Sequence, residues 1–127
     1  MIRNLTRHTC IARNAVVLTS SLGHARGLMF QREIIPHVLL FKTERKVSLH
    51  TFFFAAPIDV VFVNTQKVVC EIREHLVPFS FCMPHTKAQC VIEAKAGVVK
   101  ETKTEVGDRL NFSPSEWGRA VPNSEKE

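Results

Sequence analysis

The feature that most constrains this chain is a series of short apolar runs separated by turn-forming residues. About seven or eight such runs follow one another at intervals of roughly 8–12 residues, and each has the length of a strand. The expected strands cover residues 5–11, 15–19, 37–41, 47–54, 58–63, 68–77, 88–96 and 109–112. No alternation of strands with long helices accompanies them. The pattern predicts a mainly β fold, as a small barrel-like or sandwich-like sheet.

One short helix is expected before the central strands. Thr19, Ser20 and Ser21 offer hydroxyl groups that can cap a helix N-terminus. Gly27 can adopt the left-handed conformation that ends a helix. Together these residues predict a helix near residues 20–26.

Length and composition indicate one domain. The chain has 127 residues, of which 45% are hydrophobic, so it can bury one ordinary core. One or two helical turns are expected within residues 98–105. Residues 113–127 are rich in Ser, Pro, Glu and Lys and predict a flexible C-terminal tail, with Trp117 as its large apolar side chain. The predicted domain therefore covers residues 1–112.

The N-terminal residues and the apolar runs bear on location. No apolar run reaches the roughly 18–20 residues that cross a bilayer, so no membrane partner is expected. The start of the chain lacks the apolar core of a secretory signal, which predicts a cytoplasmic protein with reduced cysteines.

The charge is uneven along the chain. The formal net charge is +5, and residues 1–50 hold eight basic residues but only the acids Glu33 and Glu44. Such a half attracts polyanions, so weak nucleic-acid binding is one hypothesis. A generally basic surface explains the same numbers, because no run of three or more consecutive Lys or Arg occurs.

A zinc site is conceivable but poorly supported. Cys82, His85 and Cys90 have the spacing C-x2-H-x4-C, and His75 lies upstream. Structural zinc sites usually show two closely spaced ligand pairs, and the second pair is missing here. We therefore predict no metal and no other cofactor.

Four segments in order carry a family resemblance. They are residues 26–32 (Arg-Gly-Leu-Met-Phe-Gln-Arg), 39–41 (Leu-Leu-Phe), 50–63 with Pro-Ile-Asp at 57–59, and 93–97 (Glu-Ala-Lys-Ala-Gly) followed by Gly-Asp at 107–108. Over about residues 15–112 the chain resembles the bacterial and archaeal proteins of domain-of-unknown-function family 192. The resemblance implies a compact, mostly β domain without an established activity. One departure is that His-Thr-Phe-Phe-Phe at 50–54 replaces the common bacterial Trp-Met-Lys-Asn-Thr, so no role of that polar cluster carries over.

Six polar residues in these segments are candidate ligand-binding residues. They are Arg26, Arg32, Thr51, Asp59, Glu93 and Asp108. Asp59 lies inside an apolar strand, where an unpaired carboxylate is costly to bury. It either pairs with Arg26 or Arg32 as a structural ion pair, serves a ligand or a reaction, or faces water. Strand alternation places Glu93 on the opposite side from Ile92.

Phe52, Phe53 and Phe54 beside basic residues could stack on nucleic-acid bases, but core packing explains them better. At most Phe52 and Phe54 can share a face of a strand.

The chain contains no known catalytic motif, including G-x-S-x-G, a P-loop, a dinucleotide fingerprint or H-E-x-x-H. We therefore predict a binding or structural module rather than an enzyme. A hydrolase-like or metal-dependent enzyme that uses Asp59 is the alternative, and weak nucleic-acid binding is a third reading.

Overall fold

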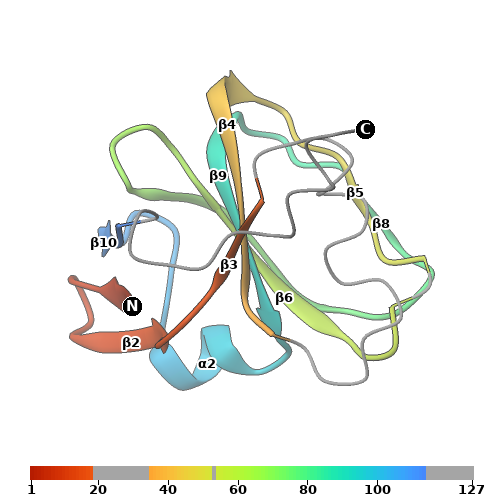
Figure 1. The fold of residues 1–127 in the computed structure, drawn as a ribbon, viewed down its shortest axis with the longest axis horizontal. Coiled ribbons are helices and arrows are strands. Elements are labelled where there is room, and N and C mark those ends of the chain that lie inside the picture. The colour runs from red at the N-terminus through yellow and green to blue at the C-terminus, as the bar shows by residue number, and fades with distance from the viewer. Residues whose placement is uncertain (19–34, 53, 114–127) are drawn as a thin grey trace.

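A five-stranded sheet forms the centre of the computed structural model, which describes residues 1–18, 35–52 and 54–113 (Figure 1). Its strand order is β3-β4-β9-β6-β7. The strands are β3 (Val16–Leu18), β4 (His37–Arg45), β9 (Ala88–Lys95), β6 (Ile58–Val63) and β7 (Val69–Leu76). The β3–β4 pair is parallel, and the other neighbouring pairs of this sheet are antiparallel.

Smaller elements cover the two faces of this sheet. A three-stranded antiparallel sheet has the order β10-β1-β2, and a two-stranded sheet pairs β5 with β8. Their bounds are β1 (Ile2–Asn4), β2 (Thr9–Ala12), β10 (Leu110–Asn111), β5 (Leu49–His50) and β8 (Phe81–Cys82). A short helix, α2 (Val98–Thr102), follows β9.

Each face of the large sheet has its own core. Successive residues of a strand point to opposite faces, so alternate residues of β6 enter different clusters. Val61 and Val63 pack with Ile2, Ile11 and Leu110 of the small sheet and with Val99 of α2. Val60 and Phe62 pack with Val47, Phe54 and Cys82 from the side of β5 and β8. All six residues of β6 are buried because both faces are covered.

The mainly β prediction is confirmed, and so is the short helical segment within residues 98–105. The sheets are open rather than closed into a barrel. The parallel pairing of β3 with β4 was not expected. A parallel pair needs a crossover connection, which here runs through residues 19–34. The helix predicted near residues 20–26 lies in that stretch, outside the described residues.

Two predicted strands differ from the observed ones. The first half of the expected strand 5–11 is instead a turn between β1 and β2, because the Asn4 side chain accepts a hydrogen bond from the Arg7 backbone N–H (3.0 Å). His8 then takes a positive φ of 59°. The expected strand 47–54 shortens to β5, since Thr51 forms a turn with the segment before β8.

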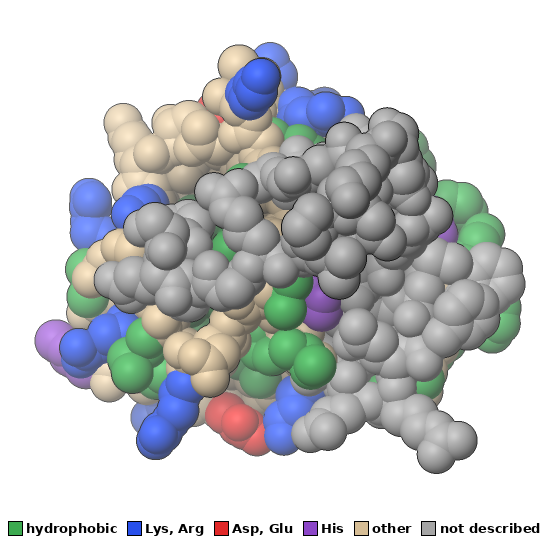
Figure 2. All heavy atoms as spheres, in the orientation of Figure 1, with side chains coloured by type: hydrophobic (Ala, Val, Ile, Leu, Met, Phe, Trp, Pro, Cys, Tyr) green, Lys and Arg blue, Asp and Glu red, His purple; other side chains and the backbone are tan. Residues whose placement is uncertain are grey.

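Within the part of the chain that the structure describes, the Lys and Arg side chains visible in Figure 2 lie scattered and do not gather in one patch. Among the described residues, no helix is long and apolar enough to cross a membrane.

Candidate functional site

Asp59 on β6 is buried, with 2% of its surface exposed, and its carboxylate is held by backbone N–H groups. Oδ1 accepts from His75 N (2.9 Å), while Oδ2 accepts from Gly97 N (3.0 Å) and Val99 N (2.9 Å). Gly97 precedes α2 with a φ of 104°, a left-handed conformation that favours glycine. Asp59 thus ties β7 and the start of α2 to the sheet. Of the interpretations that the sequence left open for Asp59, exposure to water does not hold.

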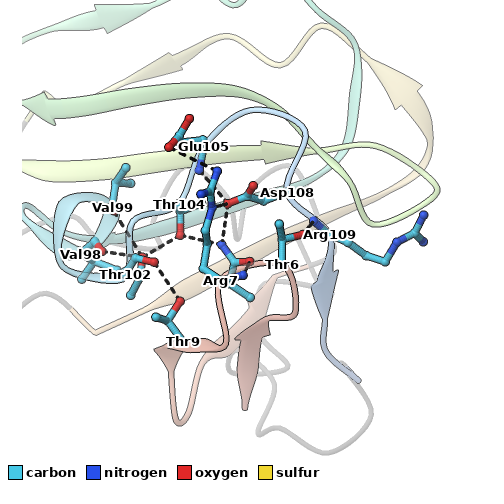
Figure 3. Close-up of polar contacts among 11 residues, drawn as sticks. Thr6, Arg7, Thr9, Val98, Val99, Thr102, Thr104, Glu105, Asp108 and Arg109 are labelled. Atoms are coloured by element: carbon cyan, nitrogen blue, oxygen red, sulfur yellow. Dashed lines mark hydrogen bonds and ion pairs between the residues drawn. The ribbon is translucent and has the colours of Figure 1, made fainter.

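Asp108 belongs to a second hydrogen-bond network, which joins the N-terminal hairpin to the segment after α2 (Figure 3). Its Oδ2 accepts hydrogen bonds from Asn4 Nδ2 (2.9 Å), Arg7 Nε (3.0 Å) and the Glu105 backbone N–H (2.9 Å). Burial opposes ionisation, but the hydrogen bonds from Arg7 and Asn4 outweigh it and lower the pKa of Asp108. Through these contacts Asp108 holds the N-terminal hairpin against the segment that follows α2.

Thr51 organises the turn that leads into β8. Its side chain is 1% exposed, and its Oγ1 donates to the Val77 carbonyl (2.6 Å) and accepts from Ser80 N (2.8 Å). The Thr51 carbonyl accepts a further hydrogen bond from Phe79 N (3.1 Å). Phe79 is held at a φ of 63° with 72% of its surface exposed.

An aromatic cluster surrounds this turn. The Phe52 ring lies 4.9 Å from the His50 ring and 5.0 Å from the Phe81 ring, between ring centres. Phe54 instead enters the core on the β5 side of the sheet, in agreement with the core-packing interpretation. Phe53 lies outside the described residues.

Glu93 on β9 differs from the other buried acids. Only 4% of its surface is exposed, and it lines a pocket of about 340 Å³. Among the residues that the structure describes, no N–H or O–H group donates a hydrogen bond to its carboxyl. Burial raises the pKa of Glu93 to about 8. Near neutral pH this carboxyl is therefore largely protonated, and it can both donate and accept a hydrogen bond.

His37 lies beside Glu93 on the same face of the sheet, because the register places the two residues directly opposite each other on β4 and β9. His37 is buried, and its Nδ1 contacts the Ile35 carbonyl at 2.6 Å. Burial lowers the pKa of His37, although the hydrogen bond to Ile35 acts in the opposite direction. In the neutral ring Nδ1 therefore carries the proton, which leaves Nε2 as an acceptor.

The pocket in front of Glu93 has an apolar wall and a basic end. Its described lining comprises Leu39, Phe41, Val47, Leu49 and Phe54, together with Arg45, Lys46, Ser48, His50 and Glu93. The Arg45 guanidinium lies over the Phe41 ring, 5.0 Å from its centre. The arrangement can hold a small molecule by apolar contact, by a hydrogen bond at Glu93 and by charge at Arg45 and Lys46.

The structure does not bring the conceivable zinc ligands together. Cys90 packs in the core on the α2 side of the sheet, whereas Cys82 packs in the core on the other side. Burial raises the pKa of both thiols, which disfavours the thiolate that zinc requires. The His85 backbone N–H donates to Glu71. Within residues 1–18, 35–52 and 54–113, no group of three or more acidic, His or Cys side chains is placed to hold a metal ion.

The sequence-predicted candidates thus separate into different places. Asp59 and Asp108 are occupied by the fold, Thr51 orders a turn, and Glu93 lines the pocket. Arg26 and Arg32 lie outside the described residues. Sequence reasoning missed Arg45, Lys46 and His50 as parts of the Glu93 pocket. Because residues 37, 39 and 41 alternate along β4, the sequence could have indicated that they share the face that forms one wall of the pocket. The basic end of the pocket follows an irregularity in the pairing of β4, and no sequence pattern predicted that irregularity.

These features define a class: a small mainly β domain with an open five-stranded sheet and a pocket on one of its faces. The chain belongs to the family DUF192 (Uncharacterized ACR, COG1430), whose family model matches residues 4–112. The resemblance seen in the sequence is confirmed, and no activity is established for this family.

Archaeal relatives and solved structures agree with this assignment. A UPF0127 protein of Pyrococcus furiosus is 35% identical over 97 residues, covering 75% of this chain and 78% of the relative. A UPF0127 protein of Thermococcus sibiricus is 29% identical, covering 97% of this chain and 81% of the relative. A Sinorhizobium meliloti protein described as a proposed transcription regulator has a TM-score of 0.72 at 24% identity, covering 76% of this chain and 79% of that chain. The last similarity shows a shared fold.

Proposed function

We propose that this protein is a binding module whose ligand occupies the pocket in front of Glu93. The observation that carries the proposal is a carboxyl with 4% of its surface exposed that lines a cavity and receives no hydrogen bond from the described residues. Burying a polar group without a hydrogen-bond partner costs free energy of folding. A buried carboxyl beside a cavity therefore indicates a ligand that forms the hydrogen bond when it binds. The cavity of about 340 Å³ falls within the usual range for small-molecule sites.

An enzyme that uses Asp59 has less support. Both oxygens of that carboxylate already accept backbone hydrogen bonds, so neither is free to serve as a base without loosening α2. Asp59 also points to the face of the sheet that is covered by α2 and β1, away from the pocket. Glu93, rather than Asp59, is the carboxyl that a ligand can reach.

Nucleic-acid binding through the N-terminal half also has less support. The described Lys and Arg side chains are scattered on the face in Figure 2, whereas backbone recognition of a polyanion favours a continuous basic stripe. The Sinorhizobium meliloti protein shares the fold at 24% identity, and its description as a proposed regulator concerns that protein.

We also propose the bounds of the binding domain and its place in the cell. We place the domain at residues 1–112, which the family match over residues 4–112 supports. A prokaryotic, cytoplasmic protein is consistent with relatives from archaea. From its composition we also propose that the stretch 113–127 forms a flexible C-terminal tail.

Ligand screening by nuclear magnetic resonance tests the binding function. The ¹⁵N-labelled chain is titrated with a fragment library, and the expected result is a set of fragments that shift the amide signals of Leu39, Leu49 and Glu93. Glu93→Gln should change the affinity of these fragments, while Glu74→Gln, an exposed carboxyl on β7, should not. A library that leaves all three signals unmoved would overturn the proposal.

A further inference from the structure

We infer that the ligand of the Glu93 pocket is an elongated amphipathic anion, with its anionic group at Arg45 and Lys46, an unbranched apolar body, and an uncharged polar group at Glu93. This inference rests on the proposed function and names the chemical class of its ligand. It follows from the order in which the lining residues succeed one another along the sheet.

The two polar ends of the pocket lie far apart. The register places Glu93 opposite His37 at one end and Arg45 opposite Ala88 at the other. Glu93 lies five positions along β9 from Ala88, and at a rise of about 3.3 Å per residue these five steps span roughly 17 Å. Because side chains reach inward from both ends, a molecule somewhat shorter than this span can contact both. A compact ligand would reach only one of them.

The middle of the pocket is apolar. Leu39 lies between the two ends on β4, and Val47, Leu49 and Phe54 face it from the segment that follows. Val47 and Phe54 are themselves buried in the core, so they form a fixed wall. A hydrocarbon body gains stability on this wall by leaving water, and a charged or hydrated body does not.

The open end carries positive charge that no acidic side chain opposes among the described lining residues of that end. Arg45 and Lys46 are exposed, and the neighbouring acid Glu44 is turned away, because its carboxylate accepts a hydrogen bond from Thr65 N (2.8 Å). His50 also lines the pocket and adds a further potential donor. A carboxylate or phosphate head group fits these residues, whereas an ammonium head group is repelled by them.

The closed end selects a different group. A second anion would meet the Glu93 carboxyl in a site with no described donor beside it, and burying that charge is costly. A hydroxyl or amide of the ligand can instead donate a hydrogen bond to the carboxyl or accept one from it, and no second charge has to be buried. The order anion, chain, hydroxyl is therefore the pattern that fits the whole pocket.

Calorimetry with chain-matched probes tests the inference on the full chain, at concentrations below micelle formation. We expect 10-hydroxydecanoate to bind at least about tenfold more tightly than hexanoate or decyltrimethylammonium, and several-fold more tightly than decanoate. Arg45→Gln with Lys46→Gln should weaken 10-hydroxydecanoate about tenfold or more, while Lys42→Gln on the exposed part of β4 should leave it unchanged. Glu93→Leu should abolish the preference for 10-hydroxydecanoate over decanoate and still bind decanoate, which also shows that the variant folds.

The outcomes separate the two proposals. The anion inference is overturned if decyltrimethylammonium binds as tightly as the anions or more tightly. It is also overturned if no chain-matched anion binds while library fragments still shift the signals of Leu39 and Glu93. Either result leaves the binding function standing. Signal shifts confined to the exposed rings of Phe79 and Phe81 also overturn it, because they report surface adsorption. If neither fragments nor probes move a pocket signal, both proposals fall.

Discussion

Asp59 and Glu93 are close neighbours in the sheet, yet their carboxyl groups point to opposite faces. The register pairs Asp59 with Ala94 and Val60 with Glu93, so the two acids are one position apart on adjacent strands. Three backbone N–H groups hold Asp59 on the α2 side, whereas Glu93 lines the pocket on the β5 side. The two buried carboxyls thus differ in chemistry: backbone N–H groups satisfy the Asp59 carboxylate, whereas the Glu93 carboxyl faces a cavity.

Glu93 should make the protein less stable as the pH rises. Its pKa in the folded chain is about 8, against an ordinary value of 4.5, so the folded chain keeps a proton that the unfolded chain releases. Its contribution to the free energy of unfolding is complete below about pH 4.5 and is lost as the pH rises toward 8. The slope in that window is at most about 1.4 kcal/mol per pH unit. Urea titrations at several pH values measure it.

The variant Glu93→Gln cannot ionise and should lose this pH dependence, becoming more stable than the parent at pH 8 relative to pH 5. Glu74→Gln, which removes an exposed carboxyl from β7, is the matched control and should keep the slope of the parent. Parallel stability curves for the parent and Glu93→Gln across this range would show that Glu93 ionises normally in the folded chain.

Removing the Asp59 carboxylate should destabilise the start of α2. In Asp59→Asn one oxygen becomes an NH₂ group, which cannot accept from the backbone N–H groups that Asp59 holds. The expected loss is about 2–4 kcal/mol in the free energy of unfolding, because buried donors are left unsatisfied. Hydrogen exchange at the Val99 amide should accelerate in the same variant. Stability equal to the parent would instead indicate a carboxylate kept for a ligand.

Much of the sheet was predictable from the sequence, because its strands are short apolar runs with clear turn residues between them. A nearly continuous run of Val, Ile and Phe forms β6, which pairs with β7 and β9, and such a run predicts a strand that is buried on both faces. The position of Glu93 opposite to Ile92 followed from strand alternation and is confirmed by the separate core clusters.

The partners of Asp59 were not predictable in the same way. The sequence indicated that a buried Asp59 would need a partner, but its hydrogen bonds come from backbone N–H groups of residues 75, 97 and 99, which any sequence possesses. A pattern of side chains carries no signal for such partners. The basic end of the pocket was missed for a related reason, since Arg45 and Lys46 reach it only through an irregular stretch of β4.

Asp108 should give the protein a loss of stability in acid. Burial disfavours its charge, but the hydrogen bonds from Arg7 and Asn4 prevail and lower its pKa below the ordinary value of 3.8. Its contribution is therefore complete above the unfolded-state pKa and is lost as the pH falls through the folded-state pKa. Asp108→Asn should lower the free energy of unfolding by about 1–3 kcal/mol at pH 7 and by less near pH 3. A difference between variant and parent that stays constant from pH 7 to pH 3 would contradict this account.

The Thr51 hydroxyl should control the turn that displays Phe79. Thr51→Val keeps the shape of the side chain but removes the donor to the Val77 carbonyl and the acceptor for Ser80 N. Two partly buried backbone groups then lose these hydrogen bonds, so we expect a loss of about 1–3 kcal/mol in the free energy of unfolding. Because Phe79 holds a positive φ of 63° only with this support, its turn should also become more mobile.

Thr51→Ser is the control for that change, because it retains the hydroxyl and loses only a methyl group. Chemical denaturation of both variants gives the energy, and hydrogen exchange at the Ser80 amide gives the local effect. We expect Ser80 to exchange faster in Thr51→Val and near the parent rate in Thr51→Ser. If both variants lose the same stability and leave Ser80 protected, the methyl packing of Thr51, and not its hydrogen bonds, holds the turn.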